Sequence, residues 1–353
     1  MIRKECFTKE WIETVRDRFK YNDVNLIEKV IRAFSLVEML SESGCPYIWK
    51  GGSCLMLLLG SGLHRLSIDV DIVCPPGTDI EQYLAKFPEY GFIGRETIER
   101  EQRFSSVPKS HEKLHYRVAY LSQTERTESI LLDVLYEDAQ YEKVETKNIE
   151  SPFILLDGAP LTVKVPSVDD ILADKLTAFA PNTSGIPYFK NGKPKFVEII
   201  KQLYDIGRLF DAMDGLETIC RVFNRIAPIE LAYKCLSDEP TVIFQDIRDT
   251  ALCLATRGKA GRGDFDALQK GVTFMRPFMY QSKYYIEDAI TDAAKAACLA
   301  TSIEKGANAI PRYDRDRQTP VLQPMLSNKL NKLRVILPEA YYYWALTSQM
   351  MQQ

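Results

Sequence analysis

The fold of this chain is indicated by one alternating stretch, Leu66-Ser67-Ile68-Asp69-Val70-Asp71-Ile72-Val73. Side chains alternate between the two faces of a β-strand, so Ser67, Asp69 and Asp71 project from one face and the apolar residues from the other. The Cα atoms of Asp69 and Asp71 then lie about 6.6 Å apart at ~3.3 Å per residue. Both carboxylates can therefore bind one hard divalent cation or a pair of them. The alternative is an amphipathic strand whose acidic face is only solvated.

A glycine-rich segment precedes this stretch, Lys50-Gly51-Gly52-Ser53, between a strand expected at 46–49 and a helix expected at 54–59. Glycine allows close approach to the backbone, and the N–H groups at a helix start can hold phosphate oxygens. The segment lacks both the P-loop pattern and the dinucleotide-binding glycine pattern. It is a candidate phosphate-binding segment, with an ordinary turn as the alternative.

A third carboxylate, Asp133, interrupts the otherwise apolar stretch from Ser129 to Tyr136, within a strand expected at 128–137. An unpaired charge there is costly unless it meets a cation or a hydrogen-bonding partner. An aspartate near solvent at a strand end is the alternative. Asp133 is therefore a candidate third metal ligand.

Two charged residues stand out in the helices expected at 168–179 and 196–213. Lys175 takes a core-facing position of the first helix, so its ammonium either extends to solvent or points into a cleft and neutralises a triphosphate. Asp205 lies toward the polar flank of the second helix. A surface ion-pair cluster with charged residues three and four positions away explains Asp205 equally well.

The pattern along the chain predicts the α+β class, with a small mixed sheet and flanking helices followed by a helical C-terminal half. We expect helices at 9–19 and 24–42, and strands at 115–122, 128–137, 152–156 and 161–165. From Ser167 onward the signals are helical except for a polar loop at 181–195. We expect two domains, 1–165 with the sheet and 166–353, which contributes Lys175 and Asp205 to the active-site cleft.

Composition limits the class of protein. The chain has 353 residues, of which 46% are apolar, so it can bury a core. Its net charge of −3 excludes binding of nucleic acid through a uniformly basic surface. The eight cysteines form no Cys-x-x-Cys pair, which disfavours a zinc site. The N-terminus shows no signal-peptide pattern and no apolar run is long enough to cross a membrane, so we expect a cytoplasmic protein without membrane contact.

The ordered set of motifs resembles the AbiEii/AbiGii toxin family of nucleotidyltransferases over about residues 45–212. The motifs are Lys50-Gly51-Gly52-Ser53, Arg65 to Asp71, Asp133, Leu172-Ala173-Asp174-Lys175-Leu176 and Lys201-Gln202-Leu203-Tyr204-Asp205-Ile206. That family belongs to the DNA polymerase β-like nucleotidyltransferase superfamily. Its members include toxins of toxin–antitoxin and phage-abortive systems, among them MenT-like toxins.

The resemblance implies a role for each matching residue. Asp69 and Asp71 match the metal-binding Asp-x-Asp, with Asp133 as the third carboxylate. Gly52 and Ser53 match the phosphate-contacting pair, Lys175 the triphosphate-contacting lysine and Asp205 the last acidic motif. Lys50, Gly51, Arg65 and Ser67 flank these motifs as further candidate nucleotide-binding residues. A simple surface arginine is the alternative for Arg65.

The implied reaction is Mg²⁺-dependent transfer of a nucleoside monophosphate from an NTP, through a two-ion site, by a toxin with a cognate antitoxin protein. We expect the acceptor to be an RNA, namely the 3′ end of a tRNA. The alternatives are a small-molecule or protein hydroxyl acceptor, or a catalytically silent scaffold that binds a partner. Residues 1–240 carry a net charge of −7 and residues 241–353 carry +4. This asymmetry suits an acidic metal-binding half and a mildly basic half for RNA, with solvated loops and helix faces as the default explanation of the basic clusters.

Overall fold

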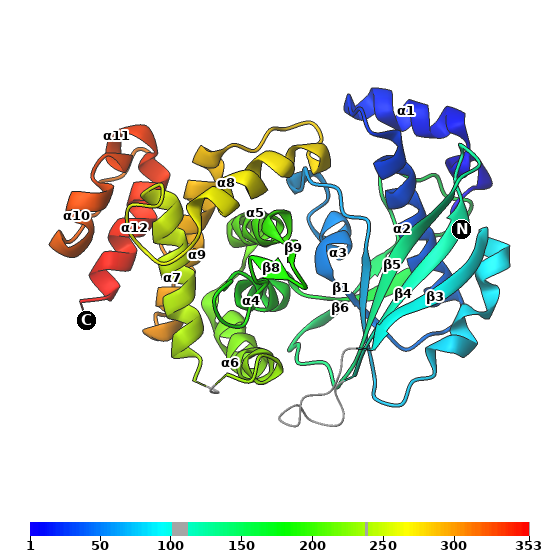
Figure 1. Cartoon of the computed structure of the whole chain (residues 1–353), viewed down its shortest axis with the longest axis horizontal. Helices are drawn as coiled ribbons and strands as arrows, with labels where there is room; N and C mark the ends of the chain where they lie inside the picture. Colours follow the sequence, from blue (N-terminus) through cyan, green and yellow to red (C-terminus); the bar gives the residue numbers. More distant parts are fainter. Residues whose placement is uncertain (101–111, 237–238, 353) are drawn as a thin grey trace. The chain divides into compact units, whose positions relative to one another are not determined.

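The chain folds into two compact units in the computed structural model, which describes residues 1–100, 112–236 and 239–352. Unit 1 comprises Met1–Ser167 and Pro277–Lys283, and unit 2 comprises Val168–Arg276 and Tyr284–Gln353. Unit 1 holds a mixed sheet with helices, and unit 2 is almost wholly helical (Figure 1). The predicted α+β class is confirmed. The predicted division into domains 1–165 and 166–353 stays a prediction.

Among the described residues, the main sheet of unit 1 has five strands in the order β1-β2-β5-β4-β3. Strands β2 and β5 are parallel, and the other neighbouring pairs are antiparallel. The strands are β1 (Ile48–Lys50), β2 (Val70–Cys74), β3 (Phe92–Arg100), β4 (Glu112–Leu121) and β5 (Thr127–Tyr136). The predictions of β1, β4 and β5 are confirmed.

The strand predicted at 66–73 is shorter than expected, since β2 begins only at Val70. The residues before it pair with the segment 277–283 instead of with the sheet. The Leu66 amide donates to the Phe278 carbonyl at 2.8 Å, and Arg65 forms an antiparallel bridge with Met279. Only Asp71 of the predicted acidic pair therefore lies within the sheet, and Asp69 lies just before it.

One face of the sheet is apolar and packs under helix α2 (Val24–Glu42). The register aligns Trp49, Ile72 and Val134 across three strands, and all three are buried. The Phe34 ring of α2 meets the Trp49 ring edge-on at 5.5 Å. Because side chains alternate along each strand, the residues next to these three point to the opposite face.

The other elements of unit 1 are short. They are η1 (Lys4–Phe7), α1 (Lys9–Phe19), α3 (Gly51–Leu58), η2 (Gly60–Gly62), η3 (Ile80–Tyr90) and a ribbon of β6 (Val144–Asn148) with β7 (Thr162–Pro166). The helices predicted at 9–19 and 24–42 are confirmed.

The strand predicted at 152–156 is wrong, and the strand at 161–165 pairs with β6 instead. Carbonyl groups within 152–156 accept hydrogen bonds from the N-terminal segment instead. The Arg3 amide donates to the Leu155 carbonyl at 2.9 Å, and Trp11 Nε1 donates to the Phe153 carbonyl at 3.0 Å. This long-range competition leaves no hairpin around residues 157 and 158.

Unit 2 is built around helix α9 (Ile286–Glu304), which packs against α5, α7 and α12. Its buried face is rich in alanine, which lets neighbouring helices approach closely. The other elements are α4 (Val168–Ala178), β8 (Phe189–Lys190), β9 (Lys193–Pro194), α5 (Phe196–Ala212), α6 (Leu216–Tyr233), α7 (Thr241–Ala255), α8 (Phe265–Phe274), α10 (Pro324–Leu330), α11 (Leu333–Ile336) and α12 (Pro338–Met350). The short helix η4 (Arg276–Phe278) begins at the last residue of the segment Val168–Arg276 of unit 2 and continues into unit 1. Within the described ranges, none of the helices combines the length and apolar character needed to span a bilayer.

Candidate active site

A row of polar and charged residues crosses four strands on the sheet face opposite α2. The register pairs Lys50 with Asp71, Asp71 with Asp133 and Asp133 with His115. Partners on neighbouring strands share a face and lie about 4.8 Å apart. Two carboxylates of the predicted site therefore lie side by side, with a lysine at one end of the row and a histidine at the other.

Asp133 has a hydrogen-bonding partner that the sequence analysis missed. Its Oδ1 lies 2.7 Å from His115 Nδ1, and the two side chains are 34% and 24% exposed. An ionised carboxylate only accepts hydrogen bonds, so Nδ1 carries the hydrogen of this bond. The signal was present in the sequence: a β-hairpin with its turn centred on Thr124 places residue 115 opposite residue 133.

The carboxylate of Asp71 lies against the first residue of helix α3. Gly51 has a φ of +79°, and a Cβ there would lie 1.9 Å from Asp71 Oδ2. Only glycine combines this backbone conformation with such close approach. The predicted turn at Gly51–Ser53 is thus the first turn of α3, and the candidate phosphate-binding segment lies beside Asp71.

Arg65 and Ser67 close around the second glycine of this segment. A Cβ on Gly52 would lie 2.6 Å from Arg65 Nη2 and 2.7 Å from Ser67 Oγ. Arg65 is only 2% exposed, and its Nη1 donates to the Leu66 carbonyl at 3.2 Å. The surface-arginine alternative for Arg65 is therefore wrong.

Ser53 connects helix α3 to Asp69. Its buried hydroxyl donates to the Asp69 carbonyl at 2.6 Å and accepts a hydrogen bond from Trp49 Nε1 at 3.1 Å. A hydroxyl has one hydrogen to donate, and here Asp69 takes it. The side chain of Ser53 therefore fixes the backbone of Asp69, while its own amide belongs to the first turn of α3.

Lys175 and Asp205 form a buried ion pair in unit 2. Lys175 Nζ lies 3.1 Å from Asp205 Oδ2 and donates to Gln202 Oε1 at 2.9 Å. The lysine side chain is 9% exposed and that of Asp205 is fully buried. The surface ion-pair cluster considered for Asp205 is therefore wrong, because Asp205 turns into unit 2 toward α4.

The row fits a divalent cation by its chemistry. Its donors are carboxylate oxygens, which hard divalent cations prefer. Like charges directly opposite each other destabilise a sheet, and a cation next to Asp71 and Asp133 would remove that repulsion. Among residues 1–100, 112–236 and 239–352, no three His, Cys, Asp or Glu side chains are already arranged around a common metal position. The motif resemblance assigns a cation to Asp69, Asp71 and Asp133, and of these three the register places Asp71 beside Asp133.

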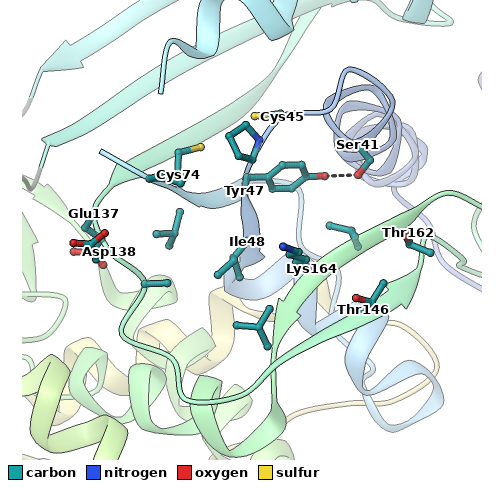
Figure 2. Close-up of a pocket in the computed structure, with 16 residues that line it drawn as sticks. Ser41, Cys45, Tyr47, Ile48, Cys74, Glu137, Asp138, Thr146, Thr162 and Lys164 are labelled. Carbon is teal, nitrogen blue, oxygen red and sulfur yellow. Dashed lines mark hydrogen bonds between the residues drawn. The ribbon is translucent and has the colours of Figure 1, made fainter. Parts of the chain in front are cut away.

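A pocket of about 600 Å³ lies at the other end of β1 and β2, beside the ribbon of β6 and β7. Figure 2 shows the Tyr47 hydroxyl directed at Ser41, to which it is hydrogen-bonded at 2.7 Å. None of the lining residues belongs to the predicted site. A hydrogen bond to Cys74 and burial raise the pKa of the Cys45 thiol in this pocket, which makes Cys45 a poor nucleophile.

Comparisons with known proteins identify a family and a similar fold. A family model of the AbiEii toxin, described as a nucleotidyl transferase of a type IV toxin–antitoxin system, matches residues 36–273. The solved structure of MenT4, a nucleotidyltransferase toxin from Mycobacterium tuberculosis H37Rv, covers 94% of this chain and 98% of its own length, with a TM-score of 0.52 and 13% identity. At that identity the likeness concerns the fold alone. A comparison with curated proteins gave no match.

The fold and the family match define the chain as a nucleotidyltransferase. Because the family match covers well over half of the residues, the chain belongs to the AbiEii nucleotidyltransferase toxin family of type IV toxin–antitoxin systems. The resemblance inferred from the motifs is confirmed. Membership implies an NTP substrate, a divalent metal ion and an antitoxin partner.

Proposed function

We propose that the chain transfers a nucleoside monophosphate from an NTP to the 3′ end of a tRNA, with Mg²⁺ as its metal ion. In this reaction the acceptor oxygen bonds to the α-phosphorus and pyrophosphate leaves. The observation that best supports nucleotidyl transfer is the register of Asp71 beside Asp133, next to the N-terminus of α3. Carboxylates for a cation and helix N–H groups for phosphate are the two elements that this transfer requires.

Three carboxylates are the proposed metal ligands. Asp71 and Asp133 lie on neighbouring strands, and the bond from Ser53 fixes the backbone of Asp69 just before β2. A two-ion Mg²⁺ site supplies charge stabilisation for the entering and leaving oxygens. Asp69, Asp71 and Asp133 would hold these ions.

The β and γ phosphates are assigned to the α3 N-terminus and its neighbours. The N–H groups of Gly52 and Ser53 are favourably placed, because the first N–H groups of a helix have no partner within the helix. Lys50, at the end of the charged row, and Arg65 would add positive charge. Gly51 and Ser67 shape this segment through their contacts with Asp71 and Gly52.

The buried pair of unit 2 is assigned to the same reaction. Lys175 would contact the triphosphate through its ammonium group, as its match to the family motif implies. The Asp205 carboxylate fixes the position of this ammonium group through the ion pair at 3.1 Å. Asp205 itself matches the last acidic motif and is the proposed fourth catalytic carboxylate.

The RNA acceptor is supported by charge alone. Arg257 and Arg262 are exposed near the end of α7, and Arg257 pairs with Glu287 at 2.9 Å. Arg312, from another basic cluster, instead donates to the Met213 carbonyl at 3.1 Å and so supports the end of α5. Cytoplasmic localisation stays a prediction.

The test is incubation of the protein with radiolabelled NTP and Mg²⁺ together with total RNA, total protein and small hydroxyl compounds in separate reactions. We expect label in the tRNA fraction, and its loss in Asp71→Asn. Asp138→Asn serves as the control, because Asp138 is an exposed carboxylate of unit 1 outside the charged row. Label in protein or a small compound only would overturn the tRNA assignment, and transfer that survives Asp71→Asn would overturn the site.

A further inference from the structure

His115 occupies a position in the charged row that the proposed mechanism does not use. Its Nδ1 lies 2.7 Å from Asp133 Oδ1 across the β4–β5 register, and Asp133 is in turn the register partner of Asp71. Asp133 therefore lies between a carboxylate on one side and an imidazole on the other. The arrangement comes from backbone pairing on both sides of β5.

The bond from His115 occupies one of the two carboxylate oxygens. Because Nδ1 donates to Oδ1, the Asp133 carboxylate is held in one orientation and Oδ2 is left for another ligand. Carboxylates that bind metals are commonly held by such a hydrogen bond from a second residue, and losing that residue typically costs 10–100-fold in metal affinity or activity. The bond also keeps Asp133 from turning away from Asp71, whose like charge repels it in the absence of a cation.

Strand β4 also contributes to a second cross-strand ion pair, which is exposed to solvent. Arg117, two residues along β4 and on the same face as His115, lies 3.1 Å from Glu96 of β3. Those side chains are 50% and 69% exposed, whereas the pair of His115 and Asp133 is half-buried. Exposed pairs of this kind contribute little to stability. Arg117 is therefore a matched control for loss of a side chain from this face of β4.

We propose that His115 is a positioning residue for the divalent cation site, acting through the hydrogen bond from its Nδ1 to Asp133. This inference rests on the proposed function, in which Asp133 is a metal ligand. It adds a residue from β4 to a cation site whose proposed ligands lie just before β2, on β2 and on β5. It also explains why a half-buried carboxylate is tolerated among the apolar residues at 130–136 of β5.

The test measures Mn²⁺ binding by electron paramagnetic resonance in the absence of NTP, on His115→Ala, His115→Asn, Arg117→Ala and Asp71→Asn. We expect His115→Ala to weaken Mn²⁺ binding 10–100-fold. His115→Asn should recover most of the affinity, because its amide nitrogen can donate from about the position of Nδ1. Arg117→Ala should bind as the unmodified protein does. The metal concentration that gives half-maximal transfer should rise in His115→Ala by a similar factor, with a smaller change in the KM for NTP.

The outcomes distinguish a failure of the proposed role of His115 from a failure of the proposed metal site. Unchanged Mn²⁺ affinity in His115→Ala, together with weakened binding in Asp71→Asn, overturns the role of His115 and leaves the metal site standing. Binding that is unchanged in Asp71→Asn overturns the metal site and this inference with it. Mn²⁺ affinity that falls equally in His115→Ala and His115→Asn, with thermal unfolding near that of the unmodified protein, also contradicts the inference. The inference attributes the effect to the hydrogen-bond donor, which asparagine retains, and not to the imidazole ring.

Discussion

The Ser53 hydroxyl donates its hydrogen to the Asp69 carbonyl at 2.6 Å while it accepts a hydrogen bond from Trp49 Nε1. These two hydrogen bonds join β1, the start of α3 and the residue before β2. It holds the two halves of the candidate site, the helix N-terminus and the first aspartate, at a fixed separation. The serine of the motif thus acts on Asp69 through its side chain and on phosphate, as we propose, through its amide.

Ser53→Ala should lower stability by about 1–3 kcal/mol, because it leaves the buried Trp49 Nε1 without an acceptor. It should lower kcat more than it changes the KM for NTP, since Asp69 loses its support. Denaturant unfolding and steady-state kinetics check both. The double variant with Trp49→Phe removes the stranded donor and should regain stability but not kcat. A KM effect with unchanged stability would instead indicate that the hydroxyl itself contacts phosphate.

Gly51→Ala should abolish transfer while the protein stays folded. The new Cβ would lie 1.9 Å from Asp71 Oδ2, so the flexible carboxylate must move away. Gly77→Ala is the matched control, because Gly77 has a similar φ of +82° with open space around it. Each change should cost about 1–2 kcal/mol for the left-handed backbone. Gly51→Ala should cost more than Gly77→Ala, because its new Cβ also lies 2.9 Å from Asp71 Cβ. We expect a loss of at least about 100-fold in Gly51→Ala alone, and equal activity of the two variants would contradict the placement of Asp71.

Lys175→Met should destabilise the protein by about 3–5 kcal/mol, because Asp205 would be left buried and unpaired. The double variant with Asp205→Asn should recover much of this stability, since neither charge remains. It should not recover transfer, because the triphosphate loses its proposed cation. Thermal unfolding and labelled-NTP transfer measure the two effects separately. Restored transfer in the double variant would remove Lys175 from the reaction and leave it a structural residue.

The stability of the protein should depend on pH through Asp292 of α9. Burial raises the pKa of Asp292 to about 6, opposed by Arg208, whose Nη2 lies 2.9 Å from Asp292 Oδ1, and by the Tyr284 hydroxyl that donates to Oδ2 at 2.9 Å. An unfolded aspartate ionises near pH 3.9, so between about pH 4 and pH 6 the folded protein binds more protons. The free energy of unfolding therefore loses about 3 kcal/mol as the pH rises through this window.

Asp292→Asn isolates this effect, because asparagine does not titrate. The unfolding free energy of the unmodified protein minus that of the variant should fall between pH 4 and pH 6 and stay constant above pH 7. Denaturant unfolding at several pH values measures this difference. A difference that does not change with pH would show that Asp292 titrates at its ordinary pKa.

Charge reversal at Arg257 and Arg262 should weaken binding of the RNA acceptor and reduce its salt dependence, because phosphate contacts are lost. Lys305→Glu, an exposed residue at the end of α9, is the control for a general change of charge. Filter binding of labelled tRNA at two salt concentrations measures both effects. Equal affinity in the Arg257 and Arg262 variants would remove these residues from the proposed RNA surface.

Much of the site could be predicted because its motifs are local. The alternation at 66–73 placed Asp71 in a strand, and two glycines before an apolar helix marked the α3 N-terminus. The limits of the strands were less predictable, since β2 starts late where residues 65 and 66 pair with a segment more than 200 residues away. The prediction of a strand at 152–156 was wrong for the same reason, because carbonyl groups in this segment accept hydrogen bonds from the N-terminal segment.

The sequence by itself determined the α+β class, the family and the residue types of the site, because these follow from periodicity and from short motifs. Only the tertiary structure decided which residues meet. The parallel pairing of β2 with β5 brings Asp71 beside Asp133, and the hairpin of β4 and β5 adds His115. Packing of α4 against α5 turns Asp205 inward to Lys175. These contacts depend on strand register and helix packing between distant segments, which no local pattern specifies.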